Sequence, residues 1–305
     1  MATTPKHPLF DRNAQYGWYD YGAYETHPAN IWFVGSCVVG CTNAFGWGMN
    51  PDSPFATIDY AVGQCTNSTG DVIYVLPGHV EVLTAAAGLD LDVIGITIRG
   101  IGEGVYQPRV ELGTIDTVDV DVDAASITVE NINFVANVAN IVAAIDVNAT
   151  DFTLRNCRFT EAGANLNALI WIQDAAAAGS DRITVEDCEV IDNNAANTHF
   201  INFAGTGTQH VFRRNSLSGD WGTVSIGGAG VITHCLCADN YVYNIAVVAE
   251  AGIHFADTAT GLLINNRCST GNASATQMGA AAMVKCENYG GLIGDSNGLL
   301  EPIAT

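Results

Sequence analysis

An eight-residue pattern recurs along the chain, and this repetition constrains the fold more than any other feature. The clearest copy is Ile183–Val190, and close copies are Ile127–Phe134 and Phe152–Phe159. Weaker copies begin at Ile96, His210, Cys235 and Leu262. The seven first positions are 31, 25, 31, 27, 25 and 27 residues apart. Apolar and polar residues alternate within each copy, which is typical of a strand that buries one face.

A second short strand is predicted before each later copy of the pattern. These strands are Val118–Val122, Ala144–Val147, Leu169–Ile172, Phe200–Phe203, Val224–Ile226 and Gly252–Phe255. Repeats of this length that contain only short strands and turns indicate stacked coils. Parallel stacking lets each coil form hydrogen bonds with the next, at about 4.8 Å per coil. The sequence therefore predicts an all-β chain folded as a parallel β-solenoid.

Equivalent positions of successive copies form columns that agree with this register. The first positions form an inward column of Ile96, Ile127, Phe152, Ile183, His210, Cys235 and Leu262. The fourth positions, Arg99, Glu130, Arg155, Glu186 and Arg213, alternate in charge and predict a ladder of ion pairs on the outer surface. The fifth positions are Asn131, Asn156 and Asp187, with Asp239 and Asn266 further on. Asn and Asp tolerate the left-handed backbone that a bend needs.

The residues before the repeat predict a helix followed by a buried strand. Ser53 is the expected N-cap, with Pro54 at the first helical position, and the helix is expected over 54–66. Phe55, Ile58, Val62 and Cys65 share one face at helical spacing. The strand Val72–Leu76 ends at Pro77 and Gly78. An earlier strand is expected at Ile31–Val34.

Composition and charge exclude several classes of function. The formal charge is −21, with 32 acidic and 11 basic residues, so the surface repels nucleic acid and anionic lipid. No apolar run reaches 18 residues, so we expect no membrane span. The beginning of the sequence lacks the pattern of a secretory signal.

The nine cysteines suggest neither a disulfide framework nor a closed metal site. Five of them, Cys157, Cys188, Cys235, Cys268 and Cys286, fall in or near the repeat and are expected to be small, reduced core residues. Cys37 and Cys41 could form a bridge or half of a metal site, but no second pair at ligand spacing follows. We expect no metal and no cofactor.

The order of a helix, the strand ending at Pro77-Gly78, and coils with an Asn-bearing bend resembles the right-handed parallel β-helix proteins of the pectate-lyase-like group. The resemblance covers roughly residues 50–290, and in that group the helix covers the N-terminal end of the solenoid. It implies three parts for this chain: an N-terminal arm and leading strand (1–50), a right-handed parallel β-helix with its capping helix (51–290) and a C-terminal tail or cap (291–305). The group contains lyases, hydrolases and inert virion proteins, so the resemblance fixes the fold more closely than the activity.

The first 30 residues are irregular and aromatic. They could form a tail that folds back over its own domain, but we favour an arm that docks on a neighbouring protein. Its candidate assembly residues are Tyr16, Trp18, Tyr19, Tyr21 and Tyr24, because exposed Tyr and Trp are favoured at interfaces. An aromatic arm and a short solenoid without a secretion signal are most similar to bacteriophage virion β-helix proteins, such as head decoration or tail components.

One surface column offers candidates for a binding or catalytic site. The outward positions of the second strands are Asp121, Asp146, Trp171, Asn202, Ser225 and His254. Asp121 and Asp146 would lie one coil apart, close enough to raise a pKa or hold a hard cation, and Trp171 could stack on a sugar ring. Asp119, Asp121 and Asp123 share one strand face, but the spacing lacks the glycine and final Glu of a calcium loop. The column contains no Lys or Arg, so a polar face or a subunit contact is the simpler interpretation.

Two functions follow from these observations. The first is a non-catalytic structural protein of a bacteriophage particle, a capsid-decorating or tail-associated homotrimer that contacts other virion proteins such as the major capsid protein. Such a protein would be made in the host cytoplasm and located in the virion. The alternative is a polysaccharide-binding or polysaccharide-degrading β-helix of lyase or glycosidase type. In that alternative Asp121 and Asp146 are catalytic, Trp171, Asn202 and His254 contact a surface polysaccharide, and the carboxylates act across about 5–9.5 Å.

Overall fold

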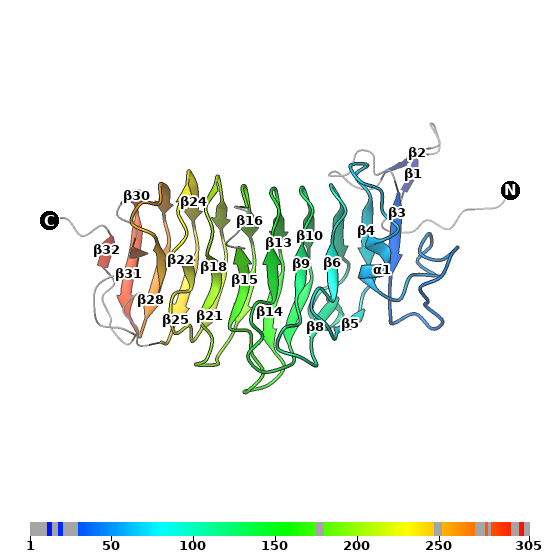
Figure 1. Cartoon of the computed structure of the whole chain (residues 1–305), viewed down its shortest axis with the longest axis horizontal. Coiled ribbons are helices and arrows are strands. Elements are labelled where there is room, and N and C mark those ends of the chain that lie inside the picture. Colours follow the sequence, from blue (N-terminus) through cyan, green and yellow to red (C-terminus); the bar gives the residue numbers. More distant parts are fainter. Residues whose placement is uncertain are drawn as a thin grey trace.

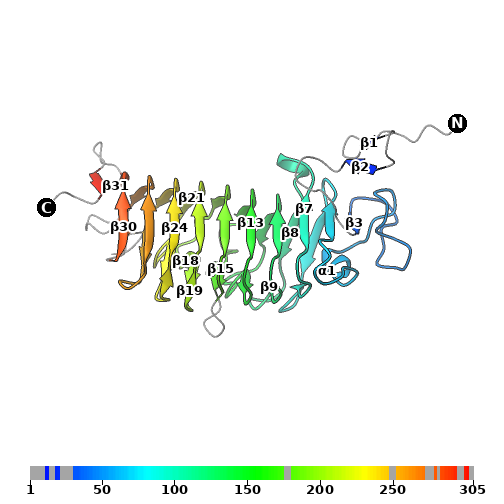
Figure 2. The same ribbon diagram turned by 90° about the horizontal axis from the view of Figure 1, so that it is seen from above.

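The computed structural model is an all-β parallel solenoid of about eight coils (Figure 1). It describes residues 11–13, 18–20, 30–174, 180–246, 252–271, 278–279, 282–293 and 299–301. In the described residues each regular coil contributes one strand to each of three sheets. The sheets run along the whole length of the rod, and Figure 2 shows the same stacking from above.

The three sheets are built from strands that recur in the same order along the chain. The first sheet consists of β3 (Ile31–Val34), β4 (Val72–Val75), β7 (Thr97–Gly100), β10 (Thr128–Glu130), β13 (Thr153–Arg155), β16 (Thr184–Glu186), β20 (Val211–Arg213), β24 (Cys235–Ala238), β27 (Gly261–Ile264) and β30 (Met283–Cys286). The second consists of β5 (Val80–Leu83), β8 (Arg109–Leu112), β11 (Asn133–Ala136), β14 (Arg158–Glu161), β17 (Glu189–Ile191), β21 (Ser216–Gly219), β25 (Tyr241–Asn244), β28 (Arg267–Thr270), β31 (Asn288–Leu292) and β32 (Leu299–Glu301). The third consists of β6 (Leu89–Leu91), β9 (Val120–Val122), β12 (Ile145–Val147), β15 (Ile170–Asp174), β18 (His199–Phe203), β22 (Ile226–Gly228), β26 (Ile253–Phe255) and β29 (Met278–Gly279).

Two further pairs of strands lie outside these sheets. They are the antiparallel pair β1 (Asp11–Asn13) and β2 (Trp18–Asp20), and the parallel pair β19 (Gly207–Thr208) and β23 (Ile232–Thr233). At the C-terminal end, β32 runs antiparallel to β31 and extends the second sheet. The predicted parallel register is confirmed, because Thr128 pairs with both Thr97 and Thr153.

The helix at the N-terminal end is shorter than the sequence predicted. α1 covers only Ile58–Val62, and its N-cap is Thr57, which accepts a hydrogen bond from the Tyr60 N–H. The prediction of Ser53 as the N-cap, with helical residues from Pro54, is therefore wrong. The reason is that Phe55 is extended and pairs with β3: its N–H donates to the Phe33 carbonyl oxygen at 2.8 Å. α1 buries Ile58, Ala61 and Val62 against the end of the solenoid.

The interior is filled by columns of apolar side chains, one from each coil. The inward third positions are Ile98, Val129, Leu154, Val185, Phe212, Cys237 and Leu263, and all are buried. Rings also pack along the rod, with 5.4 Å between the centroids of Phe134 and Phe159. The predicted inward column of first positions is confirmed from Ile96 to Cys235. The prediction that Leu262 continues this column is wrong, because Gly261 pairs with Cys235 and Leu262 is 42% exposed.

The bends between the first and second sheets use left-handed residues, as predicted for Asn131, Asn156, Asp187 and Asp239. Asn266 is a correction, because Asn265 has the positive φ of 51° and Asn266 is buried. Since two adjacent asparagines fit the pattern equally well, sequence alone did not separate the two positions.

A column of buried asparagines runs through the C-terminal half of the solenoid. Asn215, Asn240, Asn266 and Asn288 occupy it, each at most 1% exposed. The Asn215 amide donates to Asn240 Oδ1 at 3.0 Å, Asn240 to Asn266 Oδ1 at 2.9 Å, and Asn266 to Asn288 Oδ1 at 3.0 Å. Each of these oxygens also accepts a backbone N–H of the preceding coil. The column satisfies buried polar groups across four successive coils.

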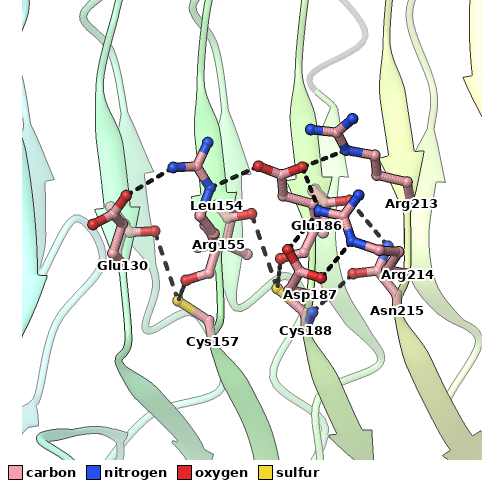
Figure 3. A network of polar contacts seen from close by, with 12 residues as sticks. Glu130, Leu154, Arg155, Cys157, Glu186, Asp187, Cys188, Arg213, Arg214 and Asn215 are labelled. Atoms are coloured by element: carbon pink, nitrogen blue, oxygen red, sulfur yellow. Dashed lines mark hydrogen bonds and ion pairs between the residues drawn. The ribbon is translucent and has the colours of Figure 1, made fainter. Parts of the chain in front are cut away.

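The predicted ladder of alternating charge is present on the first sheet (Figure 3). Arg99 Nε lies 2.6 Å from Glu130 Oε2, and Arg155 bridges Glu130 at 3.1 Å and Glu186 at 2.6 Å. Glu186 also pairs with Arg213 and Arg214. Burial alone would raise the pKa of Glu186, but hydrogen bonds from Arg213 and Arg155 hold that pKa below its usual value.

We expect the Glu186→Gln substitution to lower the free energy of unfolding by about 1 kcal/mol, because it weakens charge-assisted pairs whose arginines remain largely solvated. The measurement is urea unfolding at pH 7. Glu189→Gln is the matched control, because Glu189 pairs with Arg158 alone and is 54% exposed; its effect should stay within about 0.5 kcal/mol. Equal losses in the two variants would contradict the ladder's role.

Candidate functional site

The outward column of the third sheet contains most of the candidate residues that the sequence identified. The register stacks Asp90, Asp121, Asp146, Gln173, Asn202, Gly227 and His254 in successive coils. Asp121 and Asp146 are therefore neighbours on adjacent strands, as predicted. Asn202 and His254 also lie in this column.

Trp171 is not in this column, and its predicted role in sugar stacking is wrong. Its side chain is fully buried, its Nε1 donates to Asp192 Oδ2 at 2.7 Å, and its ring packs on Phe159. Gln173 takes the outward position, and Asn202 Nδ2 donates to Gln173 Oε1 at 2.9 Å. The run Leu169–Ile172 is uniformly apolar, so no alternation marks which face turns inward. Ser225 is likewise buried, and Gly227 occupies its predicted place.

The aspartates of this column and its flanks repel one another. Burial, followed by the charges of Asp123, Asp119 and Asp146, raises the pKa of Asp121 to about 6, although a hydrogen bond from Asn148 opposes the shift. Asn148 Nδ2 donates to Asp121 Oδ1 at 2.7 Å and to Asp123 Oδ1 at 3.0 Å. Burial, followed by the charges of Asp119 and Asp123, also raises the pKa of Asp146.

This geometry suits a polar face better than a hydrolytic or eliminating centre. Asp121 and Asp146 point from adjacent parallel strands in the same direction, whereas glycosidase carboxylates act from opposite sides of a bond. Neither forms an ion pair with a Lys or Arg in the described part of the chain that could serve as a base or electrophile. Across the described ranges, no three His, Cys, Asp or Glu side chains are arranged to hold a metal ion.

The sequence also drew attention to His210, to Cys37 and Cys41, and to the aromatic residues of the arm. His210 is buried, its Nδ1 accepts the Ile183 N–H at 3.2 Å, and burial lowers its pKa to about 4, so it is neutral. Cys37 and Cys41 are free thiols. Of the predicted assembly residues, Tyr16, Tyr21 and Tyr24 lie outside the described residues, and only the backbone of Trp18 and Tyr19 is described. None of the described helices is long and apolar enough to cross a membrane.

His79 and Glu81 form a buried polar group under α1 that the sequence did not predict. His79 Nε2 lies 3.3 Å from Glu81 Oε2, and the same oxygen accepts the Ile58 N–H at 2.8 Å. The Ser36 N–H donates to His79 Nδ1 at 3.0 Å. Glu81 thus accepts the otherwise unbonded Ile58 N–H at the start of α1 and links that helix to β5.

A carboxyl pair, the half-buried Glu161 and the buried Asp192, was also missed by the sequence analysis. Asp192 is fully buried, and burial, followed by its hydrogen bond to Glu161 and the charge of Glu161, raises the pKa of Asp192 to about 8. Asp192 is therefore protonated near neutral pH and donates its proton to a hydrogen bond with Glu161. Asn197 Nδ2 donates to both carboxyls, and the Asn193 N–H donates to Glu161 at 3.2 Å. The sequence did contain one indication of this pair: both acids occupy the tenth position of consecutive repeats, counted from Phe152 and Ile183.

Comparison with known proteins gives likenesses of fold only. No family model matches the chain, and no curated protein matches its sequence. A rhamnogalacturonan lyase structure is 12% identical with a TM-score of 0.44, over 86% of this chain and 62% of that one. This chain thus spans less than two thirds of that lyase. Pectate lyase Pel9A is 11% identical with a TM-score of 0.48, over 87% and 76% of the two chains.

A third similar structure is pectate lyase Bsp165PelA from Bacillus sp. N165 in complex with trigalacturonate. It is 12% identical with a TM-score of 0.42, over 91% of this chain and 85% of that one. None of these three TM-scores reaches 0.5, so the parallel β-solenoid is established by this chain's own strand register.

We expect the free energy of unfolding to fall as the pH rises from about 4 to about 8. Asp192 has its pKa raised from 3.8 to about 8 in the folded chain, so across this window the folded state binds more protons than the unfolded state. Asp192→Asn replaces the protonated carboxyl with an amide that cannot ionise. The variant should therefore show a flatter dependence on pH in denaturant titrations and be more stable than the unmodified chain at pH 9.

Asp121→Asn is the matched control, because Asp121 has a smaller pKa shift and is only partly buried. The raised pKa of Asp192 beside Glu161 would be contradicted if both variants flattened the pH dependence of the free energy of unfolding equally, or if Asp192→Asn left that dependence unchanged.

Proposed function

We propose that the chain is a non-catalytic structural protein that assembles as a homotrimer in a bacteriophage particle, as a capsid-decorating or tail-associated component. The arrangement of aromatic arm and short solenoid that is similar to virion β-helix proteins supports the particle assignment. The right hand of the coil and a contact with the major capsid protein belong to the same proposal.

The observation that carries the proposal is a concentration of exposed apolar side chains at the N-terminal end. Val39 and Phe45 are fully exposed, and Met49 is 66% exposed, all on the loop between β3 and α1. Val80 and Val82 on the end strand β5 are also exposed. Figure 1 shows this loop projecting beyond the stacked coils. Exposed apolar groups gathered in one place favour a docking surface.

The arm joins the solenoid at this same end. The Asn30 N–H donates to Asp71 Oδ1 at 2.9 Å, and Asp71 also accepts the Thr66 N–H at 2.8 Å. Asn30, the residue that follows the arm, is therefore fixed to the solenoid at the end that carries the exposed loop.

Light scattering on the purified chain should give a mass three times that of one 32.1 kDa chain. Deleting residues 1–30 should leave a folded monomer, because the arm is proposed to make the contact with the sister subunit. Phe45→Ser, which changes only an exposed loop side chain, is a companion variant and should weaken the trimer without altering thermal unfolding of the monomer. A full-length chain that is monomeric, or a trimer unaffected by the deletion, would contradict the proposal.

The polysaccharide alternative retains one favourable observation, the raised pKa of Asp121 beside Asp146. The same preparation should not depolymerise acidic or neutral polysaccharides. If it did, and if Asp146→Asn abolished that activity in a folded protein, the non-catalytic proposal would be refuted.

A further inference from the structure

The corner between the first and second sheets is longest in the coil that contains β7 and β8, among the described residues. From β10 to β28, two residues join each first-sheet strand to the following second-sheet strand, as Asn131 and Ile132 join β10 to β11. Between β7 and β8 the link is eight residues, 101–108, and contains the 3₁₀ helix η1 (Gly104–Tyr106). A long insertion into a solenoid repeat is a common place for a binding site.

The inserted segment is fixed to the regular corner beside it. Asn131 Nδ2 donates to the Gly100 and Gly102 carbonyl oxygens, both at 2.9 Å. Gln107 Nε2 donates to Asn131 Oδ1 at 3.2 Å, and the Gly78 N–H donates to the Tyr106 carbonyl oxygen at 2.8 Å. These bonds hold the segment in one position, so a ligand that binds against it would meet a preformed wall.

A pocket of about 230 Å³ lies between the insertion and the flat corner of the next coils. It is smaller than the roughly 300–1,000 Å³ of sites for drug-sized ligands, and it suits a single sugar ring. Its polar side chains combine amides, carboxylates and one guanidinium. They include Glu103, Gln107, Asn156, Arg158, Asp187 and Glu189.

The charges of the pocket disfavour an acidic ligand. Glu103, Asp187 and Glu189 contribute three carboxylates against the single Arg158 guanidinium. Arg158 already lies 3.0 Å from Glu189 Oε2, and Asp187 lies 2.7 Å from Arg214. Carboxylate and amide oxygens accept hydrogen bonds from hydroxyls, and amide N–H groups donate to them. The pocket therefore offers complementary groups to a neutral, hydroxyl-rich ring.

The insertion also carries an exposed aromatic side chain. Tyr106 is 65% exposed and its neighbour Val105 is 89% exposed, although both belong to the turn that forms the wall. An aromatic ring with a polar hydroxyl provides an apolar face for the C–H groups of a sugar and a hydrogen bond at its edge. Tyr106 directly precedes the lining residue Gln107 but does not itself line the pocket, so the contact proposed for it is with a part of the ligand that projects past the pocket's edge.

We propose that this corner pocket binds one neutral hexose unit of a glycan, with Gln107 and Asn156 forming hydrogen bonds to its hydroxyls and Tyr106 contacting its face. The site is separate from the aspartates of the third sheet and is independent of the proposed assembly role. Because it selects against carboxylates, it would not bind uronic acid polymers.

Saturation-transfer NMR on the full chain tests this assignment with the methyl glycosides of glucose, galactose, mannose and galacturonic acid. At least one neutral glycoside should bind with a millimolar Kd, and galacturonate should bind more weakly. Gln107→Ala and Tyr106→Ala should each raise that Kd at least fivefold. Tyr241→Ala is the matched control, because Tyr241 is 50% exposed on the second sheet away from the pocket, and it should leave the Kd unchanged.

Three results would overturn the proposal. The first is no transfer to any neutral glycoside at about 10 mM, a concentration well above a millimolar Kd. The second is binding of galacturonate at least as tight as that of the neutral sugars. The third is an unchanged Kd in Tyr106→Ala, which removes only an exposed ring and should unfold at the same temperature as the unmodified chain.

Discussion

The structure depends on register, meaning that each coil must lie directly over the one before it. A shift of one residue would turn every inward side chain to the surface. The buried asparagines oppose such a shift strongly, because Asn240 Oδ1 accepts both the backbone N–H and the side-chain amide of Asn215. A slipped coil would leave these groups buried without partners. The outer ladder from Arg99 to Arg213 adds a weaker preference, since a slip would bring like charges together.

The need to maintain this register indicates where on the molecule a functional site can lie. The regular faces of the solenoid are occupied by columns that maintain register, and none of the eight residues Ile183–Val190 requires a catalytic role. Departures from the repeat are concentrated at the N-terminal end, with its exposed apolar loop, and at the corner that carries η1. The partner contact and the sugar site that we propose lie at these two departures from the repeat.

The sequence predicted those features that recur with the coils. The parallel register, the charge ladder and the left-handed bends at Asn131, Asn156 and Asp187 are all periodic, so several copies supported each prediction. Trp171 was misplaced because its strand has no alternation. The helix was overextended because Phe55 pairs with β3, a long-range contact that local helical spacing does not reveal.

The Glu161–Asp192 pair and the inserted residue Gln107 lie outside the eight-residue pattern, so the pattern itself does not reveal their contacts. Their chemistry arises from coils stacked one over another, so only the three-dimensional register brings these groups together. The two acids do share a position in consecutive repeats, and an alignment of the copies beyond the eighth residue would have shown this.

A double-mutant cycle on Asn215 and Asn240 tests the central claim that a hydrogen-bonded amide column maintains the register. Asn215→Ala and Asn240→Ala should each lower the free energy of unfolding by about 2–3 kcal/mol, because each leaves buried groups unpaired. The double variant should lose less than the sum of the two by at least about 1 kcal/mol, since the broken bonds are shared. Losses that add within about 0.5 kcal/mol would show that the asparagines act independently, and would contradict the account.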